Sequence, residues 1–231
     1  MIEHTMLSRR DDAFIKLVGT HQIVTWSEEP IKFKSGIESH VYVNGRNDVT
    51  GSRAALRGIG GVIADLAYRA GRSPGRRLQL IGIPTAGTAL AAAAVSVAQS
   101  EFDIGCRTMR EVKKAHGKGE NQRWVDGFPQ DDEDYASVDN VVTDGQSKLD
   151  AIERLREDGY PVEQMLHIIL IDRKQGGIEK LNALGYRTAT RMDLPTVVRG
   201  LVLMGFWPKE RLERYLAERA EWADKLGVSV F

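Results

Sequence analysis

The stretch DNVVTDGQSK, residues 139–148, predicts both a fold class and the place of a ligand. Its two valines suit a buried strand, and the turn-forming residues TDGQS follow them directly. The run KLDAIERLREDG that comes next has the composition of a helix. A strand that passes through a polar turn into a helix is the repeating unit of an α/β sheet. Because open α/β sheets bind ligands at the carboxyl ends of their strands, we expect a ligand at this turn.

The rest of the chain continues this alternation of strands and helices. Residues 13–26 could form a short helix that runs into a strand. Further strands are expected at 40–44, 78–83, 103–110, 138–143, 164–172 and 186–192. Helices are expected at 52–70 (with Ser52 as N-cap), 89–99, 146–158 and 177–185, and over most of 194–226. Residues 111–134 are polar and predict a long loop. The pattern as a whole predicts parallel β-α-β units in an open sheet.

Composition limits the classes of function. The chain has 231 residues, 28% of them charged, and a formal net charge of zero, which gives no reason to expect binding to nucleic acid or to an anionic membrane. Cys106 is the single cysteine, so no internal disulfide can form, and we interpret it as a small core residue. The start is too charged for a secretory signal. The uncharged stretch 81–98 contains Pro and Gly, which favour strand, turn and helix over a membrane span. We expect a soluble, cytoplasmic protein.

The turn at residues 143–147 has the chemistry of a phosphate site. The first N–H groups of a helix lack internal partners and lie at its positive end, and hydroxyls of Thr143 and Ser147 add donors. The alternative is ordinary capping by Thr143 or Asp144 without a ligand, which is the commoner situation for such a turn alone. Asp139 and Asn140 just upstream could hold ribose hydroxyls, or a metal that binds them. A phosphate beside sugar hydroxyls indicates a phosphorylated ribose.

The same stretch resembles the phosphoribosyl-diphosphate signature of type I phosphoribosyltransferases. Four further segments resemble orotate phosphoribosyltransferases, in that family's order over roughly residues 30–190. They are FKSG at 33–36 with SHVYVN at 39–44, IPTAGTALAAA at 83–93, MREVKKAHGKG at 109–119, and IDRKQGGIEKL at 171–181. Each motif alone is weak, with the partial exception of IDRKQGG, but five in order are specific.

Several positions depart from the family's pattern. Asn140 stands where the family has a second carboxylate, and Glu111 interrupts the basic run of the loop at 109–119. The segment PTAGT lacks a lysine, and DEDYASV precedes Asp139 in place of an apolar run. These differences bear on the rate and the choice of substrate rather than on the fold.

The resemblance implies a single phosphoribosyltransferase-like domain over residues 1–231. It would combine an N-terminal hood (1–50), an open, mainly parallel α/β core flanked by helices (51–192) and a helical tail (193–231). The implied reaction transfers the phosphoribosyl group from phosphoribosyl diphosphate to orotate in pyrimidine nucleotide biosynthesis. The implied cofactor is Mg²⁺, and the implied assembly is a homodimer in which the 109–119 loop reaches the neighbouring subunit's site.

Residue roles follow from the same resemblance. The basic loop would neutralise the leaving diphosphate, residues 85–88 would bind it, and residues 143–147 would hold the 5′-phosphate. Lys34 and Arg173 would pair with the carboxylate of the base, and Tyr42 would pack on its ring. Catalytic roles are implied for Arg110, Lys113, Lys114, His116 and Asp139, with Asp139 also a metal ligand. Substrate binding is implied for Lys34, Tyr42, Thr85, Ala86, Gly87, Thr88, Asn140, Thr143, Asp144, Gly145, Gln146, Ser147 and Arg173.

Other interpretations remain open from the sequence. The basic run at 110–118 could be a solvated loop, Arg173 a surface salt-bridge partner, and Tyr42 and His167 ordinary core residues. The chain could be a phosphoribosyltransferase for another base, or a phosphoribosyl diphosphate-binding regulator with weakened catalysis. It could also be an α/β interaction module without enzymatic activity, with the acidic cluster at 131–134 as its partner surface.

Overall fold

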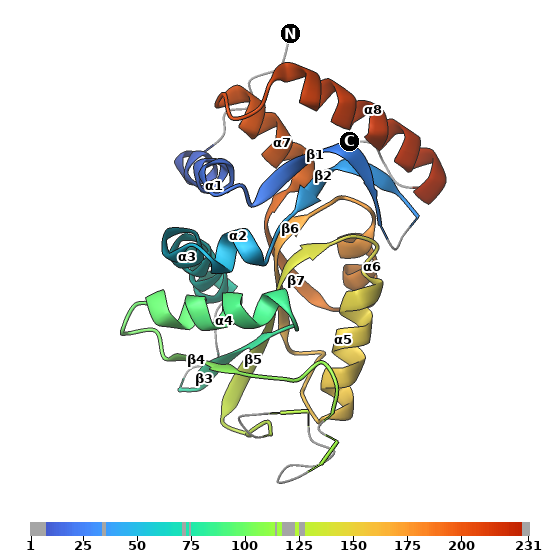
Figure 1. Ribbon diagram of the computed structural model, residues 1–231. Coiled ribbons are helices and arrows are strands. Elements are labelled where there is room, and N and C mark those ends of the chain that lie inside the picture. Colours follow the sequence, from blue (N-terminus) through green and yellow to red (C-terminus); the bar gives the residue numbers. More distant parts are fainter. Residues whose placement is uncertain are drawn as a thin grey trace.

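A five-stranded parallel sheet forms the centre of the molecule (Figure 1). The computed structural model describes residues 8–33, 36–70, 73, 75–113, 115–116, 123–124 and 128–227. The strand order is β4-β3-β5-β6-β7. The strands are β3 (Arg77–Gly82), β4 (Ile104–Arg107), β5 (Glu133–Val142), β6 (Leu166–Asp172) and β7 (Arg187–Asp193). The sequence-based expectation of an open, mainly parallel sheet is confirmed.

Helices cover both faces of this sheet (Figure 1). One face packs against α3 (Arg53–Ala70) and α4 (Ala86–Val97), and the other against α5 (Gln146–Glu157) and α6 (Gly177–Ala183). The short helix α2 (Asn47–Thr50), which the sequence did not predict, leads into α3. Ser52 caps α3 as predicted, because its hydroxyl accepts from the N–H of Ala55 at 3.2 Å.

A separate antiparallel hairpin forms the hood. It consists of β1 (Val24–Lys32) and β2 (Glu38–Val43), paired from Val24↔Val43 to Lys32↔Glu38. Helix α1 (Arg9–Thr20) precedes it, and the tail supplies α7 (Leu194–Leu203) and α8 (Lys209–Leu226). Helix α8 runs across the hairpin (Figure 1). The hood is therefore sandwiched between the sheet and the last helix of the described chain.

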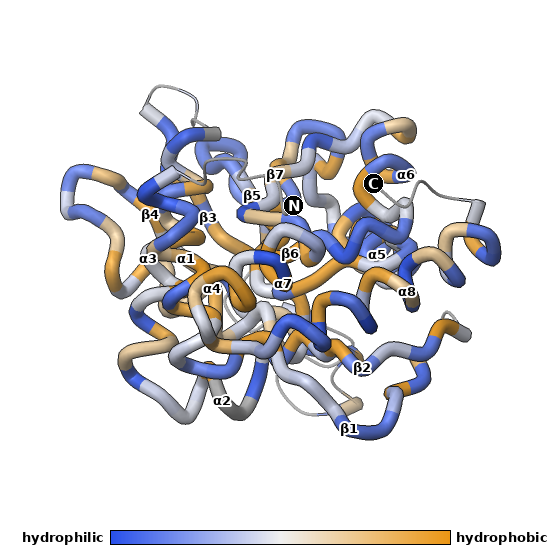
Figure 2. The backbone as a smooth tube through the Cα atoms, turned by 90° about the horizontal axis from the view of Figure 1, so that it is seen from above, coloured by the Kyte–Doolittle hydropathy of each residue, from blue (hydrophilic) through white to orange (hydrophobic). Residues whose placement is uncertain are grey.

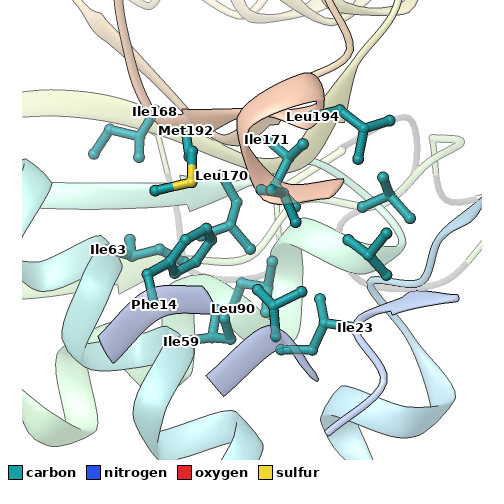
Figure 3. Close-up of a cluster of buried hydrophobic side chains, with 14 of the residues drawn as sticks. Phe14, Ile23, Ile59, Ile63, Leu90, Ile168, Leu170, Ile171, Met192 and Leu194 are labelled. Atoms are coloured by element: carbon teal, nitrogen blue, oxygen red, sulfur yellow. The ribbon is translucent and has the colours of Figure 1, made fainter. Parts of the chain in front are cut away.

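The larger hydrophobic core joins the sheet to α1, α3, α4 and α7. Phe14, Ile63, Leu90, Ile168 and Leu194 meet there, although they come from five different elements (Figure 3). The hydropathy view shows β6 and helix α4 mostly in the hydrophobic colour (Figure 2). Burial on both faces explains why β6 is apolar along almost its entire length.

Several expected boundaries were wrong. Strand β5 begins at Glu133 and not at Val138, so Glu133 and Asp134 of the acidic cluster lie inside a strand. Strand β4 is shorter than the expected 103–110, and α4 begins at Ala86, three residues earlier than expected. Burial raises the pKa of Glu133, but hydrogen bonds from Tyr135, Arg107 and Gln79 outweigh burial and hold that pKa below its usual value. Glu133 fits this strand because it accepts hydrogen bonds from Gln79 on β3 and Arg107 on β4.

The uncharged stretch at 81–98 is divided between β3, a turn and α4, as the sequence predicts. Within the described residues, no helix combines the length and apolar character that crossing a membrane requires. Cys106 lies on β4, where it is partly buried and packs against the larger core.

Candidate active site

Three strand-to-helix turns meet at the carboxyl edge of the sheet. The β3–α4 turn is joined to β5 by a hydrogen bond from Ile83 N–H to the Val138 carbonyl at 2.9 Å. The β6–α6 turn is joined to the end of β5 by bonds from Arg173 N–H to Val142 O and from Gly177 N–H to Thr143 O, both at 3.0 Å. The predicted diphosphate, ribose-phosphate and base segments are therefore neighbours in space.

Glycines allow these turns to approach so closely. A Cβ on Gly87 would overlap the carbonyl of Val138, and a Cβ on Gly177 would overlap the carbonyl of Thr143. Any side chain at either position would push a helix start away from β5. Thus α4 and α6 both begin against the strand that carries Asp139.

The turn at 143–147 combines capping with an open surface. Gly145 has a φ of 79°, which permits the sharp change of direction into α5. The Asp144 carboxylate accepts from Gln146 N–H at 3.1 Å and from the Thr143 hydroxyl at 3.3 Å. Capping by Asp144, which the sequence left as an alternative, is therefore present. Gln146 and Ser147 are exposed, so the positive end of α5 remains accessible.

Asp139 is tied to a lysine that the sequence analysis did not single out. One carboxylate oxygen accepts from Asn140 N–H at 2.8 Å, and the other forms an ion pair with the Lys148 ammonium group. Both partners of the ion pair are about nine-tenths buried, with 11% of each side chain exposed. Lys148 lies in the first turn of α5, nine residues after Asp139, so its position after a polar turn was the signal available in the sequence.

Asn140 faces the hood. A Cβ on Gly45, which follows β2, would overlap the Asn140 amide group. The predicted ribose-binding pair thus consists of a carboxylate balanced by Lys148 and an amide packed under the hood.

Asp139 is the one predicted metal ligand, and it stays a prediction. The described residues contain no group of three or more Asp, Glu, His or Cys side chains placed to hold a metal ion. The Asp139 carboxylate already accepts from Asn140 N–H and pairs with Lys148, and the neighbouring side chain is a neutral amide. Mg²⁺ in proteins commonly keeps several waters and binds one or two carboxylates together with substrate phosphates, so one carboxylate such as Asp139 fits a shared site of this kind.

Arg173 is a buried cation between the sheet and the hood. Only 2% of its surface is exposed, and burial lowers its pKa to about 10. One guanidinium nitrogen donates to Val41 O at 3.2 Å, and the guanidinium carbon lies 4.0 Å from the centre of the Phe33 ring. No carboxylate forms an ion pair with Arg173 within the described residues, and its Nε has no hydrogen-bond partner there. The sequence-level alternative, a surface salt-bridge partner, does not describe this environment.

Tyr42 and Lys34 are the two hood residues predicted to contact the base. Tyr42 is partly buried on β2, and its ring stacks on Phe33 with centroids 6.5 Å apart and planes 10° apart. Phe33 therefore links Tyr42 to Arg173. Lys34, the other residue predicted to contact the base, lies outside the described residues.

The predicted catalytic loop begins at an antiparallel bridge. Met109 pairs with Trp124 in an antiparallel bridge, and the Arg110 side chain donates to Trp124 O at 3.1 Å. Lys113 and His116 are exposed, while Lys114 lies outside the described part of the chain. In the described structure no hydrogen bond or ion pair joins Arg110, Lys113 or His116 to the three turns.

The two threonines of the β3–α4 turn differ in their exposure. Thr85 is exposed, without a side-chain capping bond, and Thr88 is partly buried, whereas Ala86 and Gly87 are buried at the start of α4. The peptide bond between Pro84 and Thr85 is cis, which the sequence gave no reason to expect because the second residue is not proline.

His167 is a core residue, as its apolar strand indicates. Its Nδ1 lies 2.8 Å from the hydroxyl of Ser137, and a cavity of about 10 Å³ separates this pair from Asp139 and Lys148. A larger hollow of about 350 Å³, lined by Arg76 and Asp134 among others, lies at the amino end of β5, opposite the three turns.

Comparison with known proteins finds orotate phosphoribosyltransferases and UMP synthases. No family model matches the chain. An orotate phosphoribosyltransferase from Nostoc sp. is 32% identical over 178 residues, which is 74% of this chain and 80% of that protein. The structure of UMP synthase from Leishmania donovani superposes with a TM-score of 0.72 at 20% identity, covering 92% of this chain and 42% of that one. Orotate phosphoribosyltransferase from Mycobacterium tuberculosis, in complex with 5-phospho-α-D-ribosyl 1-diphosphate, gives a TM-score of 0.56 at 18% identity, covering 81% and 98%.

The parallel sheet and the three turns at its carboxyl edge give this chain the fold of the phosphoribosyltransferase structures on which it superposes. The Nostoc enzyme is 32% identical to this chain over 178 residues, which is enough to show the family. The chain belongs to the orotate phosphoribosyltransferase family, as the five sequence motifs indicate.

Proposed function

We propose that this protein transfers the 5-phosphoribosyl group from phosphoribosyl diphosphate to orotate, giving orotidine 5′-phosphate and diphosphate in pyrimidine nucleotide biosynthesis. The observation that supports this choice of base is Arg173, a buried guanidinium group that forms no ion pair in the described structure and whose Nε has no hydrogen-bond partner there, although the charge of Glu218 acts on it. A buried charge is costly unless it is paired. A carboxylated pyrimidine supplies the missing partner in a planar form that matches the guanidinium fork.

The reaction exchanges one bond at sugar C1 for another. The bond from C1 to the diphosphate oxygen breaks, and its electron pair leaves with the diphosphate. A ring nitrogen of orotate forms the new bond to C1 and loses its proton. The turn at 143–147 would hold the 5′-phosphate, the turn at 85–88 the diphosphate, and Asp139 and Asn140 the ribose hydroxyls.

Negative charge that grows on the departing diphosphate is the main electrostatic demand of this step. Positively charged groups placed at that charge lower the barrier. We assign this role to the exposed loop residues Lys113 and His116, with Lys114 and with Arg110 at the base of the loop. The assignment rests on the family resemblance and on the exposure of Lys113 and His116.

Three further features are part of the proposal. Mg²⁺ would accompany the diphosphate, with Asp139 as the protein side chain that would help to hold it. The protein would act as a homodimer in which the 109–119 loop serves the partner's site. A cytoplasmic location stays a prediction from the sequence.

One alternative has an observation in its favour. With Asn140 in place of a carboxylate and Asp139 paired with Lys148, the ribose site carries no net negative charge. A phosphoribosyl diphosphate-binding regulator with weakened catalysis would suit such a site. The interaction module is less well supported, because Glu133 and Asp134 of its acidic cluster are ion-paired with Arg107 and Arg76.

A base panel tests the proposal. The protein is incubated with phosphoribosyl diphosphate and Mg²⁺ in the presence of orotate, uracil or another base, and nucleotide and diphosphate are quantified. We expect orotidine 5′-phosphate from orotate and no product from uracil. Binding of phosphoribosyl diphosphate without turnover of any base would favour the regulator, and turnover of a different base would overturn the orotate assignment.

A further inference from the structure

The last helix, α8, holds the hood strand that contacts Arg173. Glu218 on α8 is buried, and its carboxylate accepts from the Ser39 hydroxyl at 3.0 Å and from His40 N–H at 3.3 Å. The same carboxylate pairs with the His40 ring nitrogen Nδ1. Three groups of β2 are therefore fixed by one side chain of a helix that lies almost 180 residues later in the chain.

Two more contacts extend this attachment. The Trp222 indole N–H donates to Glu38 O at 3.1 Å, which holds the first residue of β2. Arg219 donates to the carbonyl of Arg173 at 3.3 Å and is itself buried. Side chains of α8 thus reach both the hood strand and the turn that carries Arg173.

The attachment bears directly on the guanidinium group of Arg173. Val41, whose carbonyl accepts from Arg173, follows Ser39 and His40 on β2, and its own N–H donates to the Ser39 hydroxyl at 3.0 Å. The Ser39 hydroxyl therefore connects Glu218 to the residue that orients Arg173. Because the hairpin is separate from the main sheet, backbone pairing with β3–β7 does not fix its position.

We propose that Glu218 is a positioning residue for base selection: it sets the place of β2 and, through Val41, the direction of the Arg173 guanidinium group. This inference rests on the proposed orotate specificity. It assigns to the C-terminal helix a role in choosing the base, and none in binding phosphoribosyl diphosphate, whose turns lie at β3 and β5. Hydrogen bonds to a charged acceptor are the stronger kind, so their loss should be measurable.

The test is Glu218→Gln, which keeps the size of the side chain and removes its charge. Glu221→Gln, at an exposed position of the same helix, is the matched control. KM for orotate is measured at saturating phosphoribosyl diphosphate, and KM for phosphoribosyl diphosphate at saturating orotate. We expect KM for orotate to rise by about tenfold in Glu218→Gln, as for loss of one charged hydrogen bond, with KM for phosphoribosyl diphosphate within about twofold of the parent. Glu218→Asp should recover part of the loss, and Glu221→Gln should match the parent.

Each other outcome has a defined meaning. An equal rise of both KM values, or an unchanged KM for orotate, would overturn the positioning role while leaving orotate transfer intact. A parent protein that does not turn over orotate would overturn the proposed function and this inference together. If Glu218→Gln does not fold, Trp222→Phe decides, because it keeps the ring and loses the bond to Glu38; it should raise KM for orotate selectively by a smaller factor, and an unselective effect would contradict the proposal.

Discussion

Asp139 carries the only charge of the predicted ribose-binding pair, and Asn140 brings a neutral amide. Asp139→Asn removes the charge but keeps the shape, so loss of the charged hydrogen bond should weaken binding of phosphoribosyl diphosphate by about 1.5–3 kcal/mol. The change also leaves Lys148 buried without its partner, so the free energy of unfolding should fall as well. Asn140→Ala should cost less, because a neutral hydrogen bond contributes about 0.5–1.5 kcal/mol. Calorimetric titration with phosphoribosyl diphosphate measures both, with thermal unfolding as a check on folding. Equal losses for the two variants would argue against a special role for the Asp139 charge.

His167 makes stability depend on pH. Burial lowers its pKa to about 4 in the folded chain, from an ordinary value of 6.5. Above pH 6.5 the ring is neutral in both states, so stability is full. As the pH falls toward 4 the unfolded chain alone takes up the proton, and about 3 kcal/mol of the free energy of unfolding is lost. Denaturant unfolding at pH 7 and pH 4.5 should show a smaller loss for His167→Gln than for the parent. Identical losses would mean that His167 does not stay neutral on folding.

Gly87, at the start of α4, allows the whole helix to lie close to β5. Gly87→Ala would place a methyl group on the Val138 carbonyl and separate α4 from β5, which should destabilise the fold by about 1–3 kcal/mol and weaken diphosphate binding. Gly61→Ala is the control, because no atom lies within 4 Å of its added Cβ. Within helix α3 that change should stabilise by about 0.5–1 kcal/mol. Denaturant unfolding compares the two, and a neutral Gly87→Ala would contradict the close packing at this turn.

The sequence predicted elements whose signals are local and missed features that depend on distant partners. Hydrophobic spacing and turn residues placed β3, β6, α5 and the tail helices. The early start of β5 was not predictable, because Glu133 is satisfied by Arg107, which lies 26 residues away in the chain. Lys148 was missed for a similar reason, since its partner Asp139 lies on the other side of a turn. The motifs located the three turns, but the burial of Arg173 required the hood.

In the proposed homodimer, the loop at 109–119 could act in its own subunit's site or in the partner's. Replacing Lys113 and Lys114 together with Ala should lower kcat strongly and leave phosphoribosyl diphosphate binding nearly intact, because the loop charges act on the leaving group in the transition state. Mixed dimers of this variant with Asp139→Asn should recover activity, because one site then has both a complete loop and an intact Asp139. Mixtures as inactive as their components would place the loop in its own subunit's site, and full activity of the double variant would make it a solvated segment.

We propose that the hood and the sheet together hold Arg173 for the carboxylate of the base. The most direct test is the ratio of kcat/KM for orotate to that for uracil, in the parent and in Arg173→Gln. A general loss of stability lowers both values and leaves the ratio unchanged. A site built around a charged partner should prefer orotate by about 10⁴-fold, and the variant should lose at least about 100-fold of that preference. A variant that discriminates as well as the parent would contradict the account.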